Sequence, residues 1–207
     1  MVDLSTGYTR LIIDTCLKHG LLRNQAAYVL ATARWETAHT MKPVKEAYWL
    51  SETWRKNNLR YYPWYGRGFV QLTWEANYQK AAKKTGVALD KDPDLALDAH
   101  TAADVLVIGM AEGWFTGKKL SDYITLKTSN FVGARRIVNG TDKAAQIAEL
   151  AKKYDALLKA EGYGVVTGQE PSNSKGSGKQ SDAPVITPKS LLSLLLSILS
   201  KLFRRST

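Results

Sequence analysis

The chain contains a single cysteine, so it cannot be built around an intramolecular disulfide framework. This absence is compatible with folding in a reducing cytosol. Leu11, Ile12 and Leu17 surround Cys16, which predicts a buried, unreactive thiol rather than a nucleophile.

The sequence also lacks the patterns of a metal site and of a signal peptide. The three histidines, His19, His39 and His100, lack the spacing of metal ligands, so we expect no metal site and no cofactor. Residues 1–7 contain neither a basic segment nor an apolar run, so no signal peptide is visible. The hydrophobic share of 44% and the charged share of 23% are ordinary for a globular domain.

Acidic residues are scarce compared with basic ones, and the net charge is +10. The chain from Gly168 onward carries +4 of this charge, and the residues before it carry +6. A basic balance favours acidic partners such as nucleic acid, anionic lipid or an anionic cell envelope. No basic cluster before Gly168 resembles a helix that reads nucleic acid, so we expect no nucleic-acid partner.

The hydrophobic pattern predicts a mostly α, two-lobed domain. Residues 41–72 show no sustained period, which indicates loop with short irregular or β-hairpin structure. Asn24 and Thr73 are the expected N-caps of two helices, and Gly86 and Gly162 are the expected stop signals. Helices are expected at residues 8–19, 25–37, 73–84, 94–112, 129–138 and 142–161.

A change of composition near residue 165 predicts three segments: a domain at 1–165, a flexible linker at 166–189 and a helix at 190–207. Leucine, isoleucine and phenylalanine fill one face of the last segment. The other face carries Ser193, Ser197, Ser200, Lys201 and Arg204. Its apolar run of about 13 residues is shorter than the ~20 needed to span a bilayer. The pattern predicts a cationic amphipathic helix that lies at a membrane surface.

The segment Tyr65–Tyr78, YGRGFVQLTWEANY, is the most informative part of the chain. It follows two glutamates, Glu36 and Glu46, and ten of the sixteen tryptophans and tyrosines lie between residues 35 and 78. Hydrolysis of a glycosidic bond needs one carboxyl to protonate the leaving oxygen and one carboxylate to activate water. Aromatic rings stack on the apolar faces of sugars. The pattern therefore predicts sugar hydrolysis.

These residues also resemble a known family. The YGRGFVQLTWEANY segment, Glu36 in RWETA and the RIVNG sequence at 136–140 are similar to glycoside hydrolase family 19, the chitinases. Within that family they are closest to the phage endolysins that cut peptidoglycan. The chain departs from the family pattern at Trp35, at Ala38-His39 and at Phe69-Val70. The resemblance covers residues 5–165 and implies a lysozyme-like fold.

We expect Glu36 to be the general acid and Glu46 the base on the opposite side of a groove. The resemblance implies that the hydroxyl of Thr73 holds the attacking water. Each residue also has a structural alternative without a catalytic role. Glu36 could be a surface glutamate paired with a neighbouring cation, and Glu46 could be a solvated glutamate beside Lys45. Thr73 could be a helix cap. Glu52 and Glu75 are the rivals of Glu46 for the role of base.

Seven further residues are expected to bind substrate. The resemblance implies that Asn77 holds the N-acetyl group of a sugar and that Asn139 lies on the far side of the groove. Arg67 stands between two glycines and is expected to pack beneath the site and to pair with a carboxylate. The full predicted set is Tyr48, Trp49, Tyr65, Arg67, Gln71, Asn77 and Asn139.

The resemblance and the residues together predict a monomeric endolysin that hydrolyses β-1,4 bonds of peptidoglycan glycan strands by inversion. Such an enzyme would be made in the host cytoplasm and reach the periplasm after membrane release, as by a holin. Residues 190–205 are expected to bind the anionic bacterial membrane or outer membrane, with docking on the domain or self-association as alternatives. Two other functions stay open: a chitinase, or a non-enzymatic protein that permeabilises the envelope.

Overall fold

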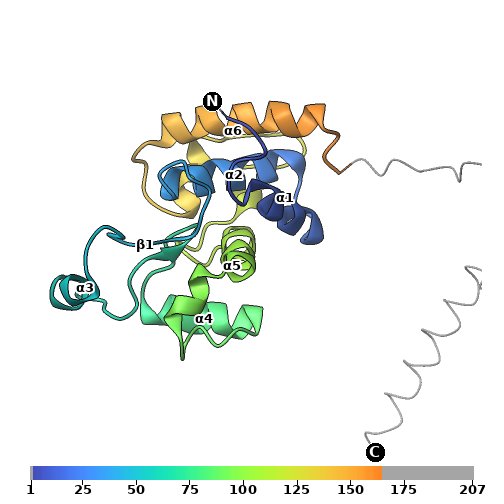
Figure 1. Cartoon of the computed structure of the whole chain (residues 1–207). Helices are drawn as coiled ribbons and strands as arrows, with labels where there is room; N and C mark the ends of the chain where they lie inside the picture. The colour runs from blue at the N-terminus through green and yellow to red at the C-terminus, as the bar shows by residue number, and fades with distance from the viewer. Residues whose placement is uncertain (1, 165–207) are drawn as a thin grey trace, which may run out of the picture. The chain divides into compact units, whose positions relative to one another are not determined.

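The structure of the protein, a computed structural model, describes residues 2–164 (Figure 1). The predicted linker at 166–189 and the predicted helix at 190–207 lie outside the described residues. Within residues 2–164 the fold is mostly helical with a small β part, as predicted. The α-helices are α1 (Thr9–Lys18), α2 (Arg23–Glu36), α3 (Glu52–Asn58), α4 (Glu75–Thr85), α5 (Ala99–Glu112) and α6 (Ala144–Ala160).

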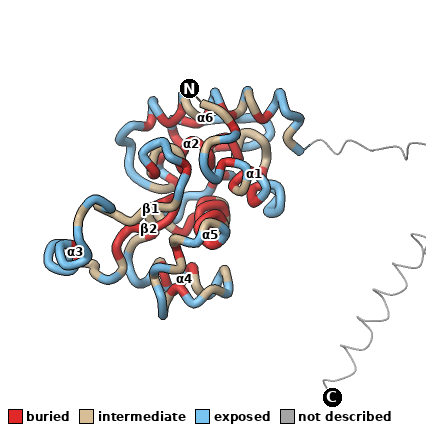
Figure 2. Tube along the Cα trace, viewed as in Figure 1, coloured by how far each residue is buried: buried red, intermediate tan, exposed pale blue. Residues whose placement is uncertain are grey.

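Helix α5 forms the centre of the domain. It packs against α1, α2 and α4, and Figure 2 shows it as largely buried. Its side chains Leu106, Val107 and Met110 are fully buried, so the apolar pattern of this helix correctly indicates the core. Helices α2 and α6 pack along each other on one side of α5, and α4 packs on the other side (Figure 1).

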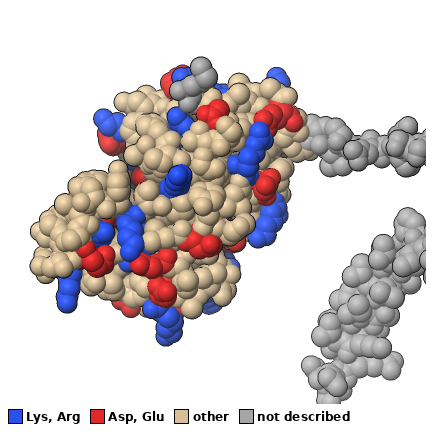
Figure 3. All heavy atoms as spheres, viewed as in Figure 1, with Lys and Arg blue, Asp and Glu red and all other residues tan. Residues whose placement is uncertain are grey.

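Charged side chains of both signs are mixed on the surface of the domain. Figure 3 shows lysine and arginine side chains interspersed with acidic ones over one face, without a continuous basic stripe. Ion pairs on the surface include Arg23 with Asp155 (2.9 Å) and Lys84 with Glu112 (2.8 Å). Exposed pairs of this kind contribute at most about 1 kcal/mol each, so the buried core is the main source of stability.

A two-stranded antiparallel sheet stands beside these helices. Strand β1 (Val44–Lys45) pairs with β2 (Arg67–Gly68), with Val44 opposite Gly68 and Lys45 opposite Arg67. The chain between the strands projects from the body and carries α3, which the sequence pattern does not predict (Figure 1). Only Arg55 of α3 is buried, so this short helix lacks the apolar stripe by which helices are recognised.

Both predicted N-caps are wrong. Helix α2 begins at Arg23, and the Asn24 side chain donates instead to the carbonyl oxygen of Thr125 (2.8 Å). Helix α4 begins at Glu75, and the Thr73 hydroxyl donates to the carbonyl oxygen of Gln71 (2.8 Å). In each case a tertiary or loop contact competes with the cap for the same polar side chain.

Two predicted helices are shorter than expected. The helix predicted at 94–112 divides into a 3-10 helix, η1 (Pro93–Leu97), and α5, because Asp98 caps α5 by accepting the Thr101 N–H (2.9 Å). The helix predicted at 129–138 reduces to the 3-10 helix η3 (Gly133–Ile137). A third 3-10 helix, η2, spans Leu120–Asp122.

The N-terminal segment holds the loop that follows α2. Gly7 has φ +51, and a Cβ atom at this position would lie 2.5 Å from the carbonyl oxygen of Thr40 and 2.6 Å from that of Met41. The next residue, Tyr8, donates its N–H to the Met41 oxygen (2.9 Å). This close contact between two backbones fixes residues 40 and 41, so only glycine fits at position 7.

We expect Gly7→Ala to destabilise the domain by about 1–3 kcal/mol more than Gly20→Ala, because only the first adds an overlap with backbone. Gly20 has a similar positive φ of +66, but nothing lies within 4 Å of the place that a Cβ atom would take there. Gly20→Ala therefore isolates the cost of the backbone conformation. Urea unfolding of both variants measures the difference, and equal losses would show that the loop yields to the added methyl group.

Candidate active site

A pocket of about 540 Å³ lies between the end of α2 and the chain around β1. Half of the ten predicted site residues line it: Glu36, Glu46, Tyr48, Trp49 and Gln71. The other half do not line it: Tyr65, Arg67, Thr73, Asn77 and Asn139. The structure therefore brings together the two predicted catalytic carboxyl groups and the predicted pair of exposed rings.

Glu36 is the last residue of α2. Its Oε1 accepts a hydrogen bond from Nη1 of Arg135 at 2.8 Å, and the two side chains are 18% and 5% exposed. Arg135 is fixed in turn, because its Nε donates to the carbonyl oxygen of Asp142 (3.1 Å). The sequence pattern does not identify this partner. The RIVNG match starts at Arg136, which is exposed, whereas the partner is the preceding residue, Arg135, which is buried within η3.

Glu46 directly follows β1 and is held by two donors. Its Oε1 accepts from the Tyr61 hydroxyl (2.6 Å), and its Oε2 accepts from the Gly66 N–H (2.9 Å). Burial and, after it, the hydrogen bond to Glu46 raise the pKa of Tyr61 to about 12. The phenol therefore stays a donor at neutral pH. The rivals of Glu46, Glu52 and Glu75, do not line the pocket.

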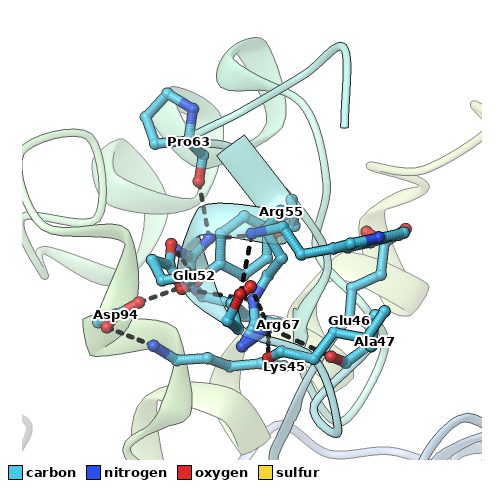
Figure 4. Close-up of polar contacts among 12 residues, drawn as sticks. Lys45, Glu46, Ala47, Glu52, Arg55, Pro63, Arg67 and Asp94 are labelled. Atoms are coloured by element: carbon cyan, nitrogen blue, oxygen red, sulfur yellow. Dashed lines mark hydrogen bonds and ion pairs between the residues drawn. The ribbon is translucent and has the colours of Figure 1, made fainter. Parts of the chain in front are cut away.

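Arg67 does not line the pocket and lies at the centre of the contacts drawn in Figure 4. Its side chain is 3% exposed, and its Nε lies 2.7 Å from Oδ1 of Asp94. Its Nη1 donates to the carbonyl oxygens of Pro63 (2.9 Å) and Tyr65 (3.1 Å). The guanidinium carbon also lies 3.6 Å from the centre of the Tyr65 ring.

Tyr65 is fully buried, and its hydroxyl donates to the carboxylate of Glu52 (3.1 Å). Neither Tyr65 nor Arg67 therefore reaches the pocket surface. Arg67 pairs with a carboxylate, as expected for this residue between two glycines. The roles of Tyr65 and Arg67 in substrate binding stay predictions.

Asp94 connects this buried arginine to the pocket wall. Its Oδ2 lies 2.8 Å from Nζ of Lys45, which lines the pocket. Partial burial acts to raise the pKa of the Asp94 carboxyl, but the hydrogen bonds and charges of Lys45 and Arg67 outweigh it. The pKa consequently lies below its ordinary value of 3.8. Asp94 thus stays ionised and is shared as a partner by two cations, Lys45 and Arg67.

Tyr48 and Trp49 form an exposed aromatic edge on the pocket. They are 63% and 71% exposed, and their rings meet edge to face at 5.1 Å. Nη1 of the buried Arg55 donates to the carbonyl oxygens of Leu50 (2.6 Å) and Ala47 (3.2 Å), which fixes the turn that carries the rings. Large exposed rings on a fixed turn suit stacking against a sugar.

The remaining predicted residues lie around this centre. Gln71 Nε2 donates to the carbonyl oxygen of Val44 (3.1 Å), which ties β1 to the pocket wall. Asn77 donates from its side chain to the Thr73 oxygen (2.9 Å). Asn139 is exposed and accepts the N–H of Gly140 (2.8 Å). Their roles in substrate binding stay predictions.

Three residues of the pocket wall have a backbone conformation that is unfavourable for side chains other than glycine. These are Ala38 (φ 48), Ala47 (φ 48) and Gln71 (φ 55). Residues in this region of φ cost free energy and persist where the surrounding structure enforces them. Their position at the pocket is typical of a functional site.

Comparisons with known proteins find similarity to chitinases. No protein-family model matches the chain. Chitinase C from Streptomyces griseus is similar in structure, with a TM-score of 0.52 and 19% sequence identity over 75% of this chain and 63% of that one. The fold of this chain is therefore similar to that of this chitinase. An endochitinase of Arabidopsis thaliana is 34% identical over 77 residues, which are 37% of this chain and 25% of the plant protein.

The chain thus spans a quarter of the length of the plant relative and less than two thirds of the Streptomyces chain. Among residues 2–164 no cluster of three His, Cys, Asp or Glu side chains is placed to hold a metal ion. None of the helices in this part of the chain is long and apolar enough to cross a membrane.

We expect Asp94→Asn to lower the free energy of unfolding by about 1–3 kcal/mol at neutral pH, because it leaves the buried Arg67 without its anion. Since the pKa of Asp94 is depressed in the folded state, its contribution is fully present above the unfolded value and is lost as the pH falls through the folded one. The difference between wild type and variant should be constant between about pH 5 and pH 7 and shrink below about pH 4. Urea unfolding across this range measures it, and a difference independent of pH would contradict the assignment.

Proposed function

We propose that the protein is an endolysin-type glycoside hydrolase that cleaves β-1,4 bonds in the glycan strands of bacterial peptidoglycan. The observation that carries the proposal is the placement of Glu36 and Glu46 in one pocket, beside the exposed rings of Tyr48 and Trp49. Two carboxyl groups and a surface for stacking sugars are the parts that glycoside hydrolysis needs.

In the proposed mechanism Glu36 protonates the leaving oxygen. Arg135 donates to Oε1 of Glu36, which leaves Oε2 as the oxygen that carries the proton. Glu46 acts as the base, since Tyr61 and Gly66 orient its carboxylate with one donor on each oxygen. Each oxygen keeps a second lone pair with which to take a proton from water.

Inversion requires space for a water molecule between the base and the sugar, which corresponds to carboxyl groups roughly 6.5–9.5 Å apart. Thr73 is the proposed holder of this water. Its hydroxyl is bound to the carbonyl oxygen of Gln71, whose side chain lines the pocket. The Thr73 oxygen keeps its lone pairs, with which it would accept a hydrogen bond from the water.

Two substrates are compatible with this chemistry. Both similar proteins are named as chitinases, which makes chitin the second candidate. Peptidoglycan carries carboxylates, whereas chitin is uncharged. The residues before Gly168 have a net charge of +6, which favours the anionic glycan.

The proposal extends to where the enzyme acts. We propose synthesis in a bacterial host, release to the wall through a membrane lesion, and contact of residues 190–205 with an anionic membrane. The apolar residues in the sequence of that segment, followed by the cations Lys201, Arg204 and Arg205, support the last step.

Glu36→Gln should reduce hydrolysis of purified peptidoglycan at least about 100-fold, because general acid catalysis typically contributes 10²–10⁴-fold. Glu46→Gln should be similarly impaired. Glu36→Gln also leaves the buried Arg135 without its anion, which should lower the free energy of unfolding by about 1–3 kcal/mol, so activity is compared at a temperature at which both proteins are folded. Mass spectrometry of the released fragments, read at the new reducing ends, measures the activity and identifies the bond.

Glu75→Gln is the matched control, because Glu75 is an exposed carboxylate outside the pocket. This variant should keep wild-type activity. If Glu36→Gln retained more than about a tenth of the wild-type kcat, the role of Glu36 as acid would be wrong.

Removal of residues 168–207 should leave hydrolysis of purified peptidoglycan intact and weaken binding to anionic liposomes. The apolar and cationic faces predicted for this segment bind a membrane by burial and by charge attraction, and salt screens the charge attraction. Co-sedimentation of full-length and truncated protein with liposomes, at low and high ionic strength, measures the effect. Equal sedimentation of both forms would favour the alternative, in which the segment docks on the domain.

A further inference from the structure

Lys42 presents a positive charge on the wall of the candidate active site. It lines the same pocket as Glu36 and Glu46, and its side chain is exposed. The other lysine of the wall, Lys45, is already paired with Asp94 at 2.8 Å. Within residues 2–164 Lys42 forms no ion pair, so its charge is available to a ligand in the pocket.

The backbone on both sides of Lys42 is fixed. Met41 is fully buried, has φ 54, and donates its N–H to the Thr37 hydroxyl (3.0 Å). The Met41 oxygen accepts the N–H of Tyr8, in the segment where only glycine fits at position 7. Pro43 follows Lys42 and restricts the chain on its other side. The lysine therefore projects from a constant point, although its own side chain remains mobile.

The two candidate glycans differ in whether they carry a negative charge that Lys42 could bind. Chitin has no charged group that could use a free ammonium. Peptidoglycan offers carboxylates on its peptide stems. A muramic acid without a stem offers instead the carboxylate of its lactyl group, which is otherwise consumed in the amide bond to the stem. An ammonium in the pocket recognises either carboxylate by the same charge-assisted hydrogen bond.

We propose that Lys42 is a specificity-determining residue that binds a carboxylate of peptidoglycan and so favours this anionic glycan over neutral chitin. The inference rests on the proposed function, because it assigns a substrate contact within the same pocket. Lys42 contributes to ground-state binding, and it is separate from the carboxyl groups that act on the glycosidic oxygen.

The test compares the KM of wild type, Lys42→Gln and Lys42→Arg on three soluble substrates. These are peptidoglycan fragments with peptide stems, glycan strands from which the stems have been removed, and chitin oligomers. Lys42→Gln should raise KM about two- to five-fold on the charged substrates, which is the range for one exposed ion pair, with kcat nearly unchanged. Lys42→Arg should restore KM, and KM on chitin oligomers should not change.

Lys153→Gln is the charge-matched control, because Lys153 is an exposed lysine of α6 and does not line the pocket. It should have no effect on any substrate. High ionic strength should remove the difference between wild type and Lys42→Gln. An effect confined to stem-free strands assigns the lactyl carboxylate as the partner, and an effect confined to intact fragments assigns the stem. An effect on both shows that the ammonium accepts either carboxylate.

Two results would overturn the proposal: an unchanged KM on both charged substrates, or an equal rise on chitin oligomers. Failure of the proposed function itself is recognised separately, as absence of hydrolysis of every glycan by the wild type. In that event, calorimetric binding of the same fragments still decides the role of Lys42. Unchanged affinity of Lys42→Gln for charged fragments would then refute it.

Discussion

The candidate active site depends on one buried cation. Arg67 is almost inaccessible to water, and a guanidinium cannot lose its charge on burial, so the surrounding structure has to satisfy it. Asp94 supplies the counter-ion, carbonyl oxygens of residues 63 and 65 supply acceptors, and the Tyr65 ring supplies a stacking surface. These partners come from η1 and from the projecting segment that carries α3, while the arginine itself belongs to β2. The requirement to satisfy one charge therefore ties together three parts of the chain.

The two carboxyl groups of the pocket are supported in contrasting ways. Glu36 stands at the end of a well-packed helix and faces a cation, Arg135. Glu46 lies in a loop and faces neutral donors, a phenol and a backbone amide. An ion pair and a pair of neutral hydrogen bonds present different electrostatic surroundings to chemically identical groups. The two carboxyl groups are therefore oriented by different kinds of partner from different parts of the chain.

The sequence predicts those features that depend on local pattern. The positions of α1 and α6 follow from apolar periodicity, and α4 ends at Gly86 in the left-handed conformation expected of a stop signal. Features decided by distant contacts are missed. The Asn24 side chain bonds to a loop 101 residues away, and α3 has no apolar stripe to reveal it. In the site, the glutamates are visible as residue types within a motif, whereas their partners Tyr61 and Arg135 become identifiable only in three dimensions.

The hydrogen bond between Glu36 and Arg135 joins residues 99 positions apart in the chain. A ribosome makes the chain from its N-terminus, so Glu36 and Glu46 emerge long before the arginine does. A nascent chain halted at residue 130 contains both carboxyl groups but not the cation that orients the first of them, nor helix α6, which packs along α2. The order of synthesis thus delays completion of the candidate site until the last third of the domain has been translated.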